Sequence, residues 1–70
     1  MNFTINGQSR TLELATGATL EQLIAALELK GDRIAVEHNG TIVQRAQWAA
    51  TPVIDGDKLE IVHFVGGGAS

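Results

Sequence analysis

The sequence predicts an α+β fold in which one main helix packs across a mixed sheet of about five strands. Asn-Gly pairs at 6–7 and 39–40 each lie between short apolar runs, a pattern typical of hairpins. One segment has the apolar spacing of a helix, and a longer strand-like run lies at 59–65. Because 70 residues bury a small core, we expect one domain over 1–65, followed by a flexible tail over 66–70.

The first hairpin is predicted from two alternating runs on either side of Asn6-Gly7. Apolar residues alternate with polar ones over 3–5 and again over 11–14. A two-residue turn pairs Ile5 with Gln8, and this register places the apolar residues of both strands on one face of the sheet. Those residues are Phe3, Ile5, Leu12 and Leu14.

The main helix is predicted to begin after Thr19. Thr19 followed by Gln22 forms a capping-box pattern, and Gly31 directly after Lys30 is a candidate C-terminal cap. The apolar residues between these ends recur at the spacing of one helix face. They are Leu20, Leu23, Ile24 and Leu27.

The second hairpin turns at Asn39-Gly40, between strands expected at 34–38 and 41–43. Its two-residue turn directs Ile34, Val36 and Val43 to one face and Ile42 to the other. Residues 44–50 lack a clean period, so we expect a short helical turn or an irregular segment there. Trp48 in this segment is interpreted as a cover for the core, with a partner contact left open.

The last strand is expected after a break at Thr51-Pro52 and a turn at residues 55–57. In the fold that this order of elements suggests, it lies beside the first strand, parallel to it, in the centre of the sheet. If Leu59 and Ile61 point toward the helix, Val62 and Phe64 point away from it. With Ile42 these two residues form a predicted partner-docking patch.

Charge and composition argue against several classes of function. The net charge is −3, with scattered basic residues, which disfavours binding to nucleic acid. The chain has no cysteine and no apolar run of membrane-spanning length, so we expect a cytoplasmic protein without a membrane segment.

The candidates for acid–base or metal chemistry have structural interpretations. His38 and His63 lack the spacing of a nucleophile or a metal site, and they are interpreted as surface or sheet residues. Asp55 and Asp57 are interpreted as turn residues rather than cation ligands. We therefore predict no catalytic residue, no metal ligand and no bound cofactor.

The chain resembles the ThiS sulfur carriers of thiamine biosynthesis, within the ubiquitin-like β-grasp group. The resemblance covers nearly the whole chain, and its most specific part is the Asp55-Gly56-Asp57 turn together with 60–68. The other matching stretches are 6–7, 19–23, 34–40 and 42–45.

The resemblance implies a protein co-substrate, not an enzyme. An E1-like adenylyltransferase of the ThiF type would use MgATP to adenylate the carboxyl group of Gly68. A cysteine desulfurase pathway would then supply the sulfur that replaces AMP, and the thiocarboxylate would serve a ThiG-type thiazole synthase. Gly66, Gly67 and Gly68 would enter the partner's active site, because a backbone without side chains passes through a narrow channel.

One departure from the family pattern is the pair Ala69-Ser70, which follows Gly68. Adenylation of Gly68 requires their removal, whether they are a remnant of cloning or an extension that a protease trims. Three alternative functions remain open: a sulfur carrier of the molybdopterin-synthase type, a ubiquitin-like protein modifier, and a binding module whose tail is inert.

Overall fold

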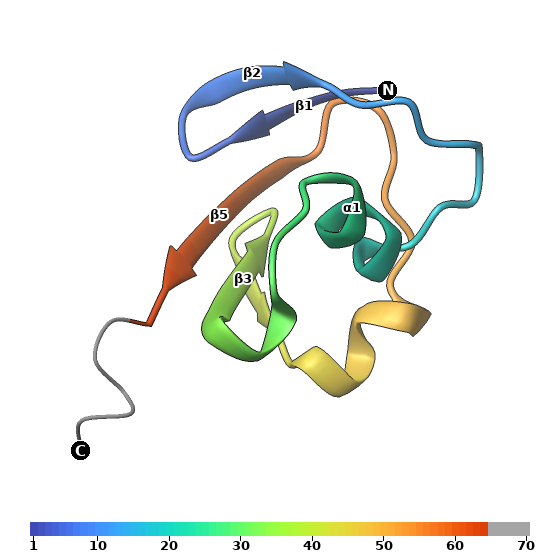
Figure 1. Ribbon diagram of the computed structural model, residues 1–70. Helices are drawn as coiled ribbons and strands as arrows, with labels where there is room; N and C mark the ends of the chain where they lie inside the picture. The colour runs from blue at the N-terminus through green and yellow to red at the C-terminus, as the bar shows by residue number, and fades with distance from the viewer. Residues whose placement is uncertain (65–70) are drawn as a thin grey trace.

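Five strands form one mixed sheet in the order β2-β1-β5-β3-β4, in a computed structural model that describes residues 1–64 (Figure 1). The predicted tail over 66–70, with Gly66, Gly67 and Gly68, lies outside these residues. The strands are β1 (Asn2–Ile5), β2 (Gln8–Thr11), β3 (Ile34–His38), β4 (Thr41–Val43) and β5 (Lys58–His63). The helical segments are α1 (Leu20–Ala26) and the 3-10 helices η1 (Gly31–Arg33) and η2 (Arg45–Ala50).

Both hairpins turn as predicted. Ile5 pairs with Gln8 and His38 with Thr41, so each Asn-Gly pair is a two-residue loop. Asn6 has φ 50° and Gly7 φ 79°, and the second turn has the same left-handed backbone. Positive φ at both central residues matches the right-handed twist of the flanking strands, which fixes the registers.

The second strand is displaced from its predicted position. It covers Gln8–Thr11, and all four of its residues are exposed. Leu12 still donates its N–H to the Met1 carbonyl. The Leu14 N–H, however, donates to the Leu12 carbonyl at 3.1 Å instead of to the neighbouring strand. The chain therefore leaves the sheet after Thr11, while Leu12 and Leu14 remain partly buried against the core.

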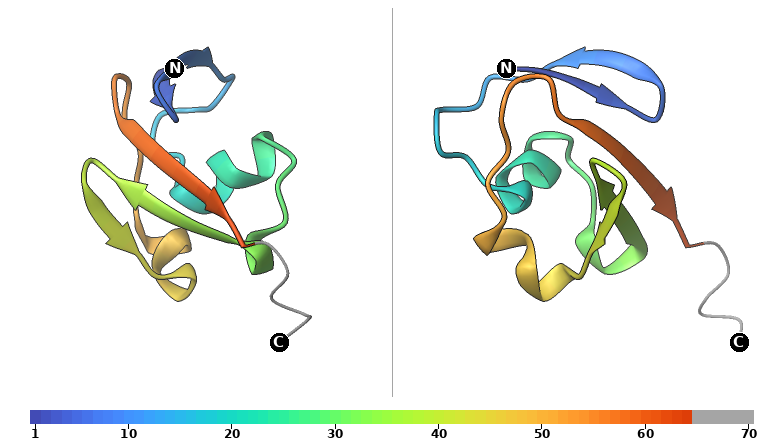
Figure 2. Two further views of the ribbon diagram at one scale, coloured as in Figure 1. Left: turned by 90° about the vertical axis from the view of Figure 1, so that its left-hand side faces the viewer. Right: turned by 180° about the vertical axis from the view of Figure 1, so that it is seen from behind.

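The last strand occupies the centre of the sheet, as predicted. β5 runs parallel to β1, with Ile5 opposite Leu59, and antiparallel to β3, with Ile34 opposite His63. Figures 1 and 2 show β5 between the two hairpins and α1 on one side of the sheet. The fold is a β-grasp.

The start of α1 is confirmed and its predicted end is wrong. The Thr19 N–H donates to Gln22 Oε1 at 2.8 Å, and Thr19 Oγ1 accepts the Gln22 N–H at 3.4 Å. The helix ends at Ala26 because Glu28 adopts φ 60°, and the N–H of Leu29 then bonds the carbonyl of Ile24 at 3.3 Å. This is a Schellman ending in which a glutamate takes the position usually held by glycine.

Gly31 has a packing role instead of the predicted capping role. A Cβ at this position would lie 2.8 Å from the Trp48 ring. Trp48 is 4% exposed and donates its indole N–H to the Val43 carbonyl at 3.0 Å, so the ring is fixed in place. The interpretation of Trp48 as a cover for the core is confirmed.

The core fills the space between the sheet and α1 and extends to η2. Its members are Phe3, Ile5, Ala18, Leu20, Leu23, Ile24, Ile34, Val36, Trp48, Val53, Leu59 and Ile61. Of these elements, β1, β3, β5 and α1 each bury one apolar face, as a two-layer domain requires.

Candidate functional site

The site is built on β5, whose residues alternate between the two faces of the sheet. Leu59 and Ile61 are buried beneath α1, while Glu60 and Val62 are exposed on the opposite face. Phe64 continues the pairing beyond β5, because its N–H donates to the Arg33 carbonyl at 2.8 Å. The chain is therefore held in place up to Phe64, two residues before the predicted tail over 66–70.

Two asparagine side chains hold β5 from its two sides. Asn6 accepts the N–H of Ile61 at 2.6 Å and donates to the carbonyl of the same residue at 3.0 Å. Asn39, at the other hairpin, accepts the N–H of Lys58 at 2.9 Å. Asparagine suits both positions because it tolerates a left-handed backbone and its amide both donates and accepts.

The sequence interpretation treated these asparagines as turn residues and missed their bonds to β5. The sequence did hold a signal for these bonds. Both hairpins have asparagine before glycine, whereas aspartate would have formed the turn but has no side-chain N–H to donate. β1 ends at Ile5 and β3 ends at His38, and the asparagine that follows each of these strands continues the hydrogen bonding to β5.

Asp57 is the centre of a buried polar cluster before β5. Asp57 is 5% exposed, and its carboxylate lies 2.7 Å from His38 Nε2. It also accepts the Asn39 side-chain amide at 3.1 Å and the Ile54 N–H at 2.9 Å. Burial alone would raise the pKa of Asp57, but these hydrogen bonds, led by that of His38, outweigh burial and lower the pKa.

This cluster links the second hairpin to the turn that begins β5. The turn interpretation of Asp55 and Asp57 is confirmed, with Gly56 at φ 92° and the Asn2 N–H bonded to Asp55 Oδ1 at 2.5 Å. His38 does lie in a strand, but its contact with Asp57 was not predicted. The two residues belong to separate elements, and their spacing in the sequence matches no motif.

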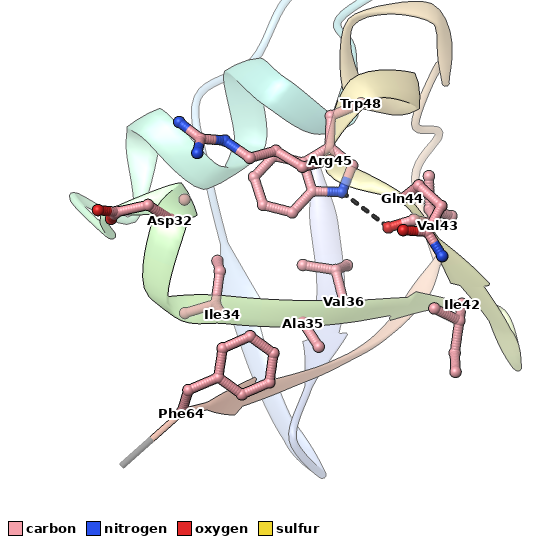
Figure 3. A pocket seen from close by; sticks show the side chains of 11 residues that line it. Asp32, Ile34, Ala35, Val36, Ile42, Val43, Gln44, Arg45, Trp48 and Phe64 are labelled. Atoms are coloured by element: carbon pink, nitrogen blue, oxygen red, sulfur yellow. Dashed lines mark hydrogen bonds between the residues drawn. The ribbon is translucent and has the colours of Figure 1, made fainter. Parts of the chain in front are cut away.

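The predicted docking residues are all exposed. The exposed fractions are 64% for Ile42, 58% for Val62 and 55% for Phe64. Figure 3 shows Ile34 and Val36 pointing toward Trp48, while Ala35, Ile42 and Phe64 lie on the other side of β3. Ile42 and Phe64 line one surface depression of about 410 Å³.

We call the exposed residues Ile42, Val62 and Phe64 the apolar patch. In the strand register, Val62 lies opposite Ala35 of β3, and Ile42 lies opposite Glu37. The sequence analysis did not single out Ile54, which is 66% exposed in the segment before β5. Partner docking at the apolar patch stays a prediction.

Residues 1–64 contain neither a metal-binding cluster nor a membrane-spanning helix. Within this range no three His, Cys, Asp or Glu side chains come together in a way that would hold a metal ion. None of the helices over the same residues is long and apolar enough to cross a membrane.

Comparison with known proteins adds relatives of two kinds. The chain is 42% identical over 69 residues to a thiazole synthase of Paramagnetospirillum magneticum, covering 99% of this chain and 21% of that protein. The chain thus spans about a fifth of the length of that relative. It is 36% identical over 64 residues to the sulfur carrier protein ThiS of Bacillus subtilis, covering 91% of this chain and 96% of that one.

A solved structure agrees with this pattern. The crystal structure of the thiamine biosynthesis protein ThiS from Geobacter metallireducens matches with a TM-score of 0.82 and 38% identity. That match covers 97% of this chain and all of the other. Because the ThiS family also matches residues 2–68, the chain belongs to the ThiS family.

Proposed function

We propose that the chain is a sulfur carrier of thiamine biosynthesis whose reactive group is the carboxyl of Gly68. The observation that carries this proposal is the position of β5. A central strand, bonded on both sides and held by two asparagines, leads directly toward the three glycines. Such a strand fixes where the tail begins, and glycines let the tail enter a narrow active site.

Gly68 is proposed as the reactive residue for two reasons. It is the last of the three glycines, and the match to the ThiS family covers residues 2–68 and so ends on it. Ala69 and Ser70 would have to be removed first, because Gly68 is otherwise held in an amide bond to Ala69.

The proposed chemistry takes place on the tail, while the partner supplies the catalytic groups. A carboxylate is a poor acyl donor, so an E1-like enzyme of the ThiF type would transfer AMP from MgATP to it, releasing pyrophosphate. A persulfide sulfur from a cysteine desulfurase pathway would then attack the acyl adenylate and displace AMP, and a thiol of the partner system would reduce the resulting acyl disulfide to leave the thiocarboxylate and a disulfide. The chain acts here as a protein co-substrate, not an enzyme, and its lack of cysteine is consistent with sulfur carried on the terminus.

The proposed acceptor is a ThiG-type thiazole synthase, and the proposed location is the cytoplasm. The match to a thiazole synthase of Paramagnetospirillum magneticum supports this acceptor over a molybdopterin-synthase partner. The apolar patch is the proposed docking surface for the E1-like enzyme, because its three side chains are exposed on one side of the sheet.

Intact-mass spectrometry tests the proposal on two matched chains, one ending at Gly68 and one retaining Ala69-Ser70. Each is incubated with the E1-like enzyme, MgATP and a sulfur source. The chain ending at Gly68 should gain the mass that separates one sulfur from one oxygen, and the longer chain should not change. No gain on the shorter chain, with an enzyme that is active on its own carrier, would contradict the proposal.

A further inference from the structure

Glu37 and Glu60 face each other directly across the β3·β5 pair, on the same face as the apolar patch. Opposed residues of an antiparallel pair bring their Cβ atoms to within about 5 Å, and like charges there destabilise a sheet. Glu60 is exposed and Glu37 is half-buried.

No cation of the described chain offsets this repulsion at ion-pair distance. Over residues 1–64, the ion pair that the structure contains joins His38 to Asp57. Lys58 shares the outer face of β5, two positions before Glu60, yet it forms no ion pair with either glutamate. Within the part of the chain that the structure describes, these two glutamates therefore have no bonded cation.

Apolar residues lie on both sides of the two carboxylates. Ile42 lies opposite Glu37 in the register, which makes one row of Ile42, Glu37 and Glu60 across three strands. Val62 follows Glu60 on the same face of β5. A long basic side chain could thus place its cationic group between the two carboxylates and pack its methylene groups on the apolar residues beside them.

We propose that Glu37 and Glu60 together bind an arginine side chain of the protein that docks on the apolar patch. A guanidinium is a planar fork that donates to two carboxylate groups at once, and its methylene stem packs on apolar residues. The net charge of −3 adds a longer-range preference for a basic partner surface.

Other occupants fit this face less well. A second copy of the chain would bring four carboxylates together in a two-fold contact. A divalent cation prefers more oxygen ligands than two glutamates supply. The inference rests on the proposed function in one respect, which is the identification of the partner as the E1-like enzyme.

The test compares two double variants with the same change in net charge. In Glu37→Gln with Glu60→Gln, the opposed pair becomes neutral. In the control, Glu13→Gln with Glu21→Gln, the charges lost lie in the β2–α1 connection and on α1. Affinity for the E1-like enzyme is measured by calorimetry at low and at high salt, and thermal stability is measured for each chain.

We expect the E37Q/E60Q chain to bind about tenfold more weakly at low salt and to lose most of its salt dependence. The control should stay within about twofold of the original chain. Thermal stability of E37Q/E60Q should be unchanged or higher, because a repulsion has been removed.

Equal affinity of the E37Q/E60Q chain and the original chain would overturn the inference, as would an equal loss in the control. If E37Q/E60Q dimerises in sedimentation experiments, the carboxylates act against self-association, which would also overturn it. The mass measurement on Gly68 separates the two proposals: a thiocarboxylate that forms while affinity is unchanged supports the function and rejects the arginine contact.

Discussion

The two faces of the sheet differ in how far they expose their apolar residues. The inner face holds Phe3, Leu59 and Ile61, of which the least buried is 6% exposed. The outer face holds Val62 and Phe64, each more than half exposed, although they alternate with inner residues along the same segment.

This difference is the basis for the proposed division between a face that folds the domain and a face that binds a partner. A chain of 70 residues has one core to bury, and its inner face supplies the strands' share of it. The outer apolar residues add little to folding while they remain in contact with water. The comparison therefore predicts that mutations on the inner face lower stability, whereas mutations on the outer face lower affinity for a partner and leave stability nearly unchanged.

The largest expected effect is on the inner face, at Phe3. Phe3→Ala should lower the free energy of unfolding by about 3 to 5 kcal/mol, because Phe3 is 2% exposed and the cavity would form in the middle of the core. Urea denaturation followed by circular dichroism measures this loss. For a domain of this size, such a loss approaches its whole stability.

The control is Ile42→Ala, which truncates an exposed apolar side chain on the outer face. It should change the free energy of unfolding by about 0.5 kcal/mol or less. Similar losses for Phe3→Ala and Ile42→Ala would contradict the proposed division between the faces.

The next largest loss of stability is expected at Asn6, one of the two asparagines that hold β5. Asn6→Gly keeps a residue that tolerates φ 50° but removes the two hydrogen bonds to Ile61. We expect a loss of about 2 kcal/mol in urea denaturation, at about 1 kcal/mol for each bond.

Asn6→Asp is the matched comparison for this position. It retains the acceptor for the Ile61 N–H but places a second acceptor against the Ile61 carbonyl, where the amide donated. If the Asn6→Gly variant is as stable as the original chain, the turn holds β5 without help from the side-chain hydrogen bonds.

A smaller effect is expected in acid. The folded-state pKa of Asp57 lies below its ordinary value of 3.8, so its charged form stabilises the fold above that pH. That contribution should be lost as the pH falls through the folded-state pKa. Urea denaturation at a series of pH values should show the loss in the original chain and a flatter profile in Asp57→Asn. Parallel profiles for the two chains would exclude Asp57 as a source of acid sensitivity.

Local sequence signals predicted most of the fold. The two Asn-Gly turns determined both hairpin registers, because a two-residue loop leaves one pairing for the residues on either side of it. Thr19 and Gln22 located the start of α1. The central position of β5 came from the fold that the order of elements suggests, since periodicity does not say which strands are neighbours.

The errors arose where tertiary contacts outweighed local preference. Glu28 ends α1 in a conformation more common for glycine, and partly buried Leu29 packs against the core just beyond it. Gly31 therefore resembled a cap while its actual role is to admit the Trp48 ring. The contact between His38 and Asp57 joins separate elements, so no local pattern announced it.

The most direct test of the two-face account is Phe64→Ala, with stability and affinity for the E1-like enzyme measured on the same preparation. We expect the dissociation constant to rise about tenfold or more, with a loss of about 1 kcal/mol or less in the free energy of unfolding. A loss of several kcal/mol with unchanged affinity would assign Phe64 to the core and contradict the account.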